Sequence, residues 1–333
     1  MLHVTNGDVA AGRMREGGLR GECLPWRDVL HDGPVPLADS LEALSAIRAR
    51  HLAGQGLGEA SRLADEFARR DAMLARCAQF GEVVLWFEHD LYDQLQLLQV
   101  LDWLGTHAVP VVPVSLIVVG AYPGIDRFVG LGQLSPAQLA GLLDTRVPAT
   151  PRHFATASQA WHAFRQPDPR AFAALLEREA PELPYLHGAV SRLLEELPST
   201  VNGLSRTERA ALDIVGRGTG RPTHVFAELQ SREERPWLGD WSFWAILAGL
   251  ARGGAPLLET AGGKPFSHPP AGLAGPAFES QVLRLTRAGR EALENRRDAV
   301  KLHPIDRWLG GTRLGPGAAW RWDGQARRLV APC

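Results

Sequence analysis

The sequence predicts an α/β protein with three parts: an N-terminal doubly wound, mostly parallel sheet, a helical connector and a C-terminal winged-helix-like domain. Strand-like and helix-like segments alternate over the first 120 residues, which is typical of a parallel sheet covered by helices. Helical segments follow from about residue 130, and three helices precede two short strands after residue 200. The 333 residues suffice for two packed cores. We therefore predict an α/β ligand-binding domain over residues 1–130, the connector over 131–200 and the winged-helix-like domain over 201–333.

Four segments of the N-terminal part have the composition of strands. The most apolar of them, Val83 to Phe87, is typical of a strand that is buried on both faces. Pro25 lacks the N–H that a ladder needs, which favours an edge position or a strand end for the second segment. The predicted strands cover residues 2–6, 22–26, 82–87 and 111–119. The predicted helices cover residues 8–16, 40–53, 59–80 and 90–104, largely from apolar residues at helical spacing.

Capping residues mark several helix starts in the rest of the chain. The Ser-Pro pair at 135–136 and the Asp-Pro pair at 168–169 each place a capping side chain before a proline that fits the first helical turn. Ser205 and Glu208 form the pattern of a capping box. Further helices are predicted at 185–197, 223–230 and 240–252, and short strands at 257–260 and 282–286. Three helices followed by a two-stranded ribbon is the order of elements in a winged helix.

Charge is divided unevenly along the chain. Residues 1–200 carry 17 arginines and 24 acidic residues, a net charge of −7, whereas residues 201–333 carry 19 basic and 13 acidic residues, a net charge of +6. A basic winged helix suits DNA, because phosphate contacts supply most non-specific affinity. The helix at 240–252, however, is almost entirely apolar and lacks side chains that read base edges. We therefore expect it to pack within the chain or at a homodimer interface, with nucleic-acid binding as the alternative.

Composition excludes several classes of protein. Hydrophobic residues make up 45% and charged residues 22% of the chain, as in globular proteins and unlike disordered or fibrous ones. No apolar run reaches the roughly 18 residues that a membrane-spanning helix needs, and no basic leader precedes an apolar stretch at the N-terminus. The three cysteines are widely separated and show no metal-binding spacing. We expect a cytoplasmic protein with no membrane partner.

Polar residues follow three of the predicted strands, at the end where each strand finishes. Because ligands of open parallel sheets bind beyond the carboxyl ends of the strands, we expect these residues to converge at one edge of the sheet and to bind a small molecule. Gly7 permits a tight turn with close approach of the backbone to a ligand. The candidates are His3, Asn6, Gly7 and Asp8 from the first strand and its end, Arg27, Asp28, His31 and Gly33 after the second, and Glu88, His89, Asp90, Asp93 and Gln94 after the third.

The charge of this predicted edge indicates its chemistry. Five carboxylates with Arg27 as the nearby cation would repel an unassisted phosphate, whereas a divalent metal would reverse that effect. His31 and His89 could join a transition-metal site. Alternatively, the carboxylates hold sugar hydroxyls while Glu88 or His89 performs acid–base chemistry and Asp90 contacts the ligand. The cofactor therefore stays open, with a divalent metal as one alternative.

Several candidates also have purely structural interpretations. Asp8 and Asp90 occupy positions where a helix needs an N-cap. Asp93 could merely complement the positive end of the following helix. Gly33 precedes a proline, as in an ordinary turn. The run from Glu88 to Asp90 is harder to explain structurally, because three ionisable residues directly after an apolar strand need hydrogen bonds or solvent.

Three motifs make the N-terminal part similar to a known family. They are His3-Val-Thr-Asn-Gly-Asp8, Trp26-Arg-Asp-Val-Leu-His-Asp-Gly-Pro-Val35 and Trp86-Phe-Glu-His-Asp-Leu-Tyr-Asp-Gln-Leu-Gln96. In these motifs residues 1–130 resemble the bacterial DUF1835 family, and the segments 204–209 and 305–311 resemble the C-terminal part of its longer members. Members share a Gly-Asp-Ser turn near the start, and Val9 replaces the serine here. The resemblance implies the fold and the position of the site, but no reaction, because the family's domain has no assigned function.

The sequence supports one leading hypothesis and two alternatives. The absence of Gly-x-Gly-x-x-Gly, Gly-x-x-x-x-Gly-Lys-Ser/Thr and Gly-x-Ser-x-Gly argues against dinucleotide dehydrogenases, ordinary nucleoside triphosphatases and serine hydrolases. The leading hypothesis is a cytoplasmic enzyme, a hydrolase or transferase, that acts on a nucleotide- or sugar-phosphate-like molecule at the sheet edge. One alternative is a ligand-sensing transcriptional regulator that binds nucleic acid through the winged-helix-like domain. The other is an assembly scaffold.

Overall fold

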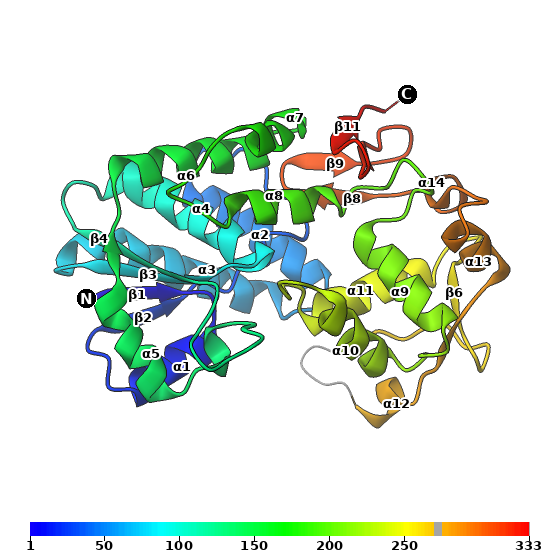
Figure 1. Ribbon diagram of the computed structural model, residues 1–333, viewed down its shortest axis with the longest axis horizontal. Helices are drawn as coiled ribbons and strands as arrows, with labels where there is room; N and C mark the ends of the chain where they lie inside the picture. Colours follow the sequence, from blue (N-terminus) through cyan, green and yellow to red (C-terminus); the bar gives the residue numbers. More distant parts are fainter. Residues whose placement is uncertain (270–274, 333) are drawn as a thin grey trace.

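A five-stranded sheet forms the centre of the N-terminal half in the computed structural model, which describes residues 1–269 and 275–332 (Figure 1). Its strands are β1 (Leu2–Thr5), β2 (Glu22–Pro25), β3 (Val83–Glu88), β4 (Val114–Val119) and β5 (Val147–Pro148). They are arranged in the order β2-β1-β3-β4-β5; the first four are parallel, and β5 is antiparallel to β4. The predicted α/β class with a mostly parallel sheet is confirmed. The fifth strand lies in the segment that the sequence assigned to the connector.

Helices cover both faces of this sheet (Figure 1). They are α1 (Asp8–Glu16), α2 (Leu41–Gly54), α3 (Ala60–Ala75), α4 (Leu91–His107), α5 (Pro136–Gly141) and α6 (Pro151–Phe164). Val84 and Trp86 of β3 share one core with residues of α1 and α5. Leu85 and Phe87 share the other core with residues of α2, α3, α4 and α6. Burial on both faces explains why β3 is an unbroken apolar run.

The order of the strands determines where a ligand can bind. The chain passes from β1 to β2 on one side of β1 and then returns to β3 on its other side. The connections that leave β1 and β3 therefore cover opposite faces of the sheet, with α1 on one face and α4 on the other. Such a reversal opens a crevice at the carboxyl ends of the two strands. Asn6 follows β1 and His89 follows β3 at this point.

The remainder of the chain is helical with small hairpins (Figure 1). Its helices are α7 (Arg170–Ala173), α8 (Leu186–Leu194), α9 (Arg206–Gly216), α10 (Pro222–Arg232), α11 (Asp240–Leu250), α12 (Pro276–Glu279), α13 (Arg287–Leu293) and α14 (Ala299–Leu302). The hairpins pair β6 (Leu258–Thr260) with β7 (Leu283–Leu285), β8 (Arg307–Leu309) with β9 (Thr312–Leu314), and β10 (Arg321–Asp323) with β11 (Arg328–Val330). Helix α8 runs from the sheet side of the molecule toward α9.

The winged-helix-like domain predicted for residues 201–333 is not supported. Outside residues 270–274 and 333, the strands of this region are three residues long and pair only in small antiparallel hairpins. The segment between β6 and β7 is rich in Gly and Pro, which restricts pairing. The apolar helix α11 buries Phe243 and Trp244, whose rings pack against Phe226 and Phe278. This face of α11 therefore belongs to a core.

Direct hydrogen bonds connect the two halves of the molecule. The N–H of Val35, beyond β2, donates to the carbonyl of Gly310 at 2.8 Å. Arg127 donates to the carbonyl of Glu233 at 2.9 Å. No helix in residues 1–269 or 275–332 combines the length and the apolar composition needed to cross a membrane.

Candidate functional site

A cleft of about 360 Å³ lies at the carboxyl ends of β1 and β3. Three parts of the chain form it: the turn from β1 into α1, the end of β3 with the first turn of α4, and the segment at 129–133. Its lining residues are Asn6, Gly7, Asp8, Val9, Ala10, Glu88, Tyr92, Val129, Gly130, Gly132 and Gln133. The volume falls in the range of roughly 300–1,000 Å³ that small-molecule sites occupy.

Asn6 connects the two strand ends. Its side-chain amide donates to Glu88 Oε1 at 3.0 Å and to Asp93 Oδ2 at 2.9 Å. Asp93 in turn accepts a hydrogen bond from the backbone N–H of Glu88 at 2.8 Å. The backbone N–H of Leu131 also donates to Glu88 Oε1, at 2.6 Å. Glu88 is thus held by groups from three separate segments.

Three carboxyl groups are buried together beside the cleft. Glu88, Asp90 and Asp93 are 6%, 4% and 1% exposed. Burial raises the pKa of Glu88, and burial together with the Glu88 carboxylate raises the pKa of Asp90 and Asp93 well above the usual range. Among the described residues, no arginine or lysine forms an ion pair with this cluster. The cluster therefore keeps protons at pH values at which exposed carboxyls are ionised.

The first turn of α1 faces the cleft with free donors. Gly7 is the N-cap of α1, and no described side chain caps the helix. The first backbone N–H groups of a helix have no partner within it, and they attract anions. Asp8 in this turn is exposed and accepts a hydrogen bond from Arg27 Nε at 2.8 Å. Arg27 has a φ of 57°, a conformation that non-glycine residues rarely adopt and that often marks a functional loop.

Four of the predicted site residues have other partners. Asp28 is fully buried and pairs with Arg48 at 2.9 Å. The Nε2 atom of His3 lies 3.1 Å from the carbonyl of Arg20, and its Nδ1 accepts from Trp86. Two further residues shape the backbone around the site. Gln94 donates to the carbonyl of Glu88 at 2.7 Å, and Gly33 has a φ of 75° and leaves no room for a Cβ beside the ring of His51.

His31 and His89, two of the three predicted site histidines, also lie outside this cleft. His89 is buried between the rings of Phe128 and Tyr185, with centroids 6.0 and 5.9 Å away. Burial lowers the pKa of His89 to about 4. His31 lines a second cavity, on the side of the sheet edge that faces α11. Its ring lies 5.9 Å from that of Tyr92, which lines the first cleft.

The sequence did not indicate that residues 129–133 line the cleft. This segment follows β4 by ten residues, so nothing in the local pattern places it beside β1 and β3. Its only signal is the pair Gly130 and Gly132 around Leu131. Gly130 has a φ of 151°, and a Cβ there would collide with both carboxylate oxygens of Glu88. This glycine therefore allows the backbone N–H of Leu131 to reach Glu88.

The same three carboxyls are the residues that could hold a divalent cation. One oxygen from each of Glu88, Asp90 and Asp93 lies within 4.8 Å of the others. Carboxylate oxygens are the ligands that such ions prefer. However, the Asn6 amide nitrogen donates to two of these groups and occupies oxygen lone pairs that a cation would use.

Comparison with known proteins gives no assignment. No family model matches the chain, and no curated protein sequence matches it either.

Proposed function

We propose that this protein is an enzyme that binds a small phosphate-bearing molecule, of the nucleotide or sugar-phosphate class, in the cleft between β1 and β3. The observation that carries the proposal is the position of the uncapped start of α1 opposite the buried carboxyl of Glu88 in one cleft. The reaction class is hydrolysis or group transfer, with Glu88 as the acid–base residue.

The start of α1 supports phosphate binding. The N–H groups of Asp8, Val9 and Ala10 open the helix, and these three residues line the cleft. Free N–H groups and the helix dipole together favour an anion at this place. Arg27 neutralises Asp8, the exposed carboxylate in this turn. Protons retained by the buried carboxyls remove much of the repulsion expected from five carboxylates in the sequence.

Glu88 is suited to acid–base chemistry. It lines the cleft, whereas Asp90 and Asp93 lie behind it and share its protons. A carboxyl whose pKa is raised by burial keeps its proton to a higher pH than an exposed glutamate does, and it can deliver that proton to a leaving group. Three segments fix its position, so little reorganisation is needed when the substrate binds.

The test is a thermal-shift and calorimetric titration with inorganic phosphate, AMP and ribose 5-phosphate, with and without Mg²⁺ or Mn²⁺. A ligand at about 100 times its Kd stabilises the folded state by about 2.7 kcal/mol. We expect stabilisation by the phosphate compounds without metal. Stabilisation only in the presence of the metal would instead assign the carboxyl cluster to a cation.

The variant Gly7→Asp locates the binding site. Gly7 has an extended backbone, and a Cβ there would meet no atom within 4 Å, so the fold should accept a side chain. Its carboxylate would cap α1 and displace the phosphate. Gly239→Asp is the control at the N-cap of α11, where a Cβ is equally unobstructed but the N–H of Trp241 already donates to Asp240. Equal phosphate affinity in both variants would contradict the proposal.

We also propose, from the three motifs alone, that the chain is a cytoplasmic member of the DUF1835 family. Asn6, Asp8, Arg27, Glu88 and Asp93 all come from these motifs and contact one another at the cleft. A purified protein of that family with the same motifs should then show the same stabilisation by phosphate compounds. The regulator hypothesis lacks such support, because Phe243 and Trp244 of α11 are buried in a core.

A further inference from the structure

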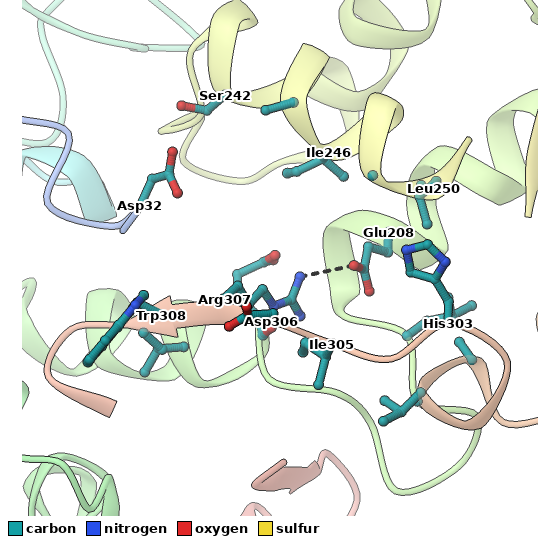
Figure 2. A pocket seen from close by; sticks show the side chains of 18 of the residues that line it. Asp32, Glu208, Ser242, Ile246, Leu250, His303, Ile305, Asp306, Arg307 and Trp308 are labelled. Carbon is teal, nitrogen blue, oxygen red and sulfur yellow. Dashed lines mark hydrogen bonds and ion pairs between the residues drawn. The ribbon is translucent and has the colours of Figure 1, made fainter. Parts of the chain in front are cut away.

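A second and larger cavity, of about 410 Å³, lies between the two halves of the molecule. Figure 2 shows Asp32 on one side, Ile246 and Leu250 of α11 on another, and the segment from His303 to Trp308 opposite them. No residue lines both this cavity and the cleft between β1 and β3. The cavity therefore offers a binding site that the proposed function does not use.

Polar atoms in the wall of this cavity lack partners. Both ring nitrogens of His31 are buried, and neither has a hydrogen-bond partner among residues 1–269 and 275–332. The indole N–H of Trp237 is also buried without a hydrogen-bond partner among these residues, and Trp237 is only 7% exposed. The two rings are in edge-to-face contact, with centroids 4.7 Å apart. Buried polar groups are nearly always hydrogen-bonded in native proteins, so this group of atoms points to a ligand.

The carboxylates of the cavity differ in whether an arginine pairs with them. Glu208 pairs with Arg307 at 2.9 Å, as the dashed line in Figure 2 shows. Glu196 and Asp306 likewise pair with arginines. Among residues 1–269 and 275–332, the carboxylate of Asp32 pairs only with the ring of His51, at 3.7 Å. Contacts with that ring hold the pKa of Asp32 below its usual range although burial opposes this, so the group is an ionised acceptor at neutral pH.

The remaining wall is apolar and aromatic. Trp237, Trp308, Ile246, Leu250 and Ile305 line it. Indole faces and branched aliphatic side chains of this kind hold flat rings by stacking and dispersion. A planar ligand is therefore favoured over a flexible polar one.

We propose that this cavity binds an uncharged, amino-substituted nitrogen heteroaromatic ring. The exocyclic amine would donate to Asp32, and a ring nitrogen would accept from the Trp237 N–H. His31, whose pKa is lowered to about 4 by burial, stays neutral at pH 7 and offers one donor and one acceptor. A ring with adjacent donors and acceptors satisfies all three residues, whereas a hydrocarbon ring satisfies none.

The two sites are neighbours. Tyr92 lines the cleft between β1 and β3, donates to the carbonyl of Asn6 at 3.4 Å, and contacts the ring of His31. The proposed heteroaromatic site nevertheless rests only on the residues that line the larger cavity. Its existence does not depend on phosphate binding at α1.

The test is a calorimetric titration of the full chain with adenine and with purine, which lacks the amine. We expect adenine to bind at least about tenfold more tightly than purine, because purine leaves Asp32 unpaired. Asp32→Ala should abolish this preference, and Trp237→Phe, which keeps the aromatic ring, should weaken adenine binding about tenfold. Asp306→Ala is the matched control, since that carboxylate is already paired, and it should change the affinity less than about threefold.

Gly249→Leu provides a second, independent test. Gly249 lies in α11 and lines the cavity, and a Cβ there would meet no atom within 4 Å. Leucine is a good helix former, so the variant should fold and fill the cavity. It should abolish adenine binding, whereas Gly7→Asp should leave it unchanged. No adenine binding at about 1 mM, an unchanged preference in Asp32→Ala, or loss in Gly7→Asp instead of Gly249→Leu would each overturn the proposal.

Discussion

Asp90 is buried beside Glu88 and also caps α4, where it accepts a hydrogen bond from the N–H of Asp93 at 3.1 Å. Burial and the Glu88 carboxylate raise its pKa well above the usual range. Between the ordinary and the raised pKa the folded state binds more protons than the unfolded state. The free energy of unfolding therefore decreases as the pH rises through this window.

The variant Asp90→Asn tests whether Asp90 makes the free energy of unfolding decrease with rising pH. Asparagine caps a helix as well as aspartate but does not titrate. Above about pH 4, its free energy of unfolding should fall less with pH than that of the wild type, as measured by urea denaturation at several pH values. Asp168→Asn is a control, because Arg170 lowers the pKa of that exposed carboxyl and the effect should have the opposite sign. Parallel pH profiles for Asp90→Asn and the wild type would contradict the account.

His89 should make the free energy of unfolding depend on pH below about pH 6.5. Its pKa is about 4 in the folded state and about 6.5 when unperturbed, so the unfolded state takes up the proton first. The wild type should lose up to about 3 kcal/mol as the pH falls from about 6.5 to about 4. His89→Leu should reduce this loss, and denaturation at pH 7 and pH 5 measures it. An equal loss in the variant would show that His89 protonates freely in the folded protein.

Single residues of the site were only partly predictable from the sequence. Asn6, Asp8, Arg27, Glu88 and Asp93 were expected together at one edge, and the structure brings them into contact. The partner of Asp28 could not be foreseen, because Arg48 comes from a helix 20 residues further along the chain. Which way a polar side chain turns after a strand depends on such distant partners.

Among the elements, the short helical turn from Leu131 to Gln133 depends on the glycine before it. Gly130→Ala should lower the free energy of unfolding by more than about 1 kcal/mol, because alanine does not fit a φ of 151°. It should also displace Glu88 from the cleft and weaken phosphate binding. Gly132 lies two residues further on at an ordinary φ, and a Cβ there would contact mainly the movable side chain of Val9. Gly132→Ala should therefore lower the free energy of unfolding by less than Gly130→Ala. Chemical denaturation that ranks the two variants in the reverse order would contradict this explanation.

Helix α1 should tolerate a better helix former at its centre. Gly12 lies in the middle of α1, and a Cβ there would meet no atom within 4 Å outside its own helix. Gly12→Ala should raise the free energy of unfolding by about 1 kcal/mol through helix propensity. Chemical denaturation measures this change, and a loss of stability would show that α1 is packed differently.

Elements with strong local signals were predicted well. The apolar run of β3, the capping box of α9 and the alternation of strands and helices all match the structure. The winged-helix interpretation is not supported, because the order of helices and strands does not determine how they pack. Phe243 and Trp244 of α11 turn to a core, and the hairpins are too short to form a wing of the expected kind.

At the scale of the whole molecule, both cavities lie where distant segments meet. The cleft joins residues from positions 6 to 133, and the larger cavity joins positions 31 to 309. Periodicity and capping describe only near neighbours along the chain. The sequence therefore indicated one edge of the sheet but not the second cavity.

The most direct test of the central claim is a backbone amide NMR titration of the protein with ribose 5-phosphate. The account predicts that the amides of residues 8–10 and of Leu131 shift first, because they line or border the cleft at the start of α1. The amides of residues 240–243, at the start of α11 and outside the cleft, should not move. Shifts at α11, or none at residues 8–10 under saturating ligand, would contradict a phosphate site between β1 and β3.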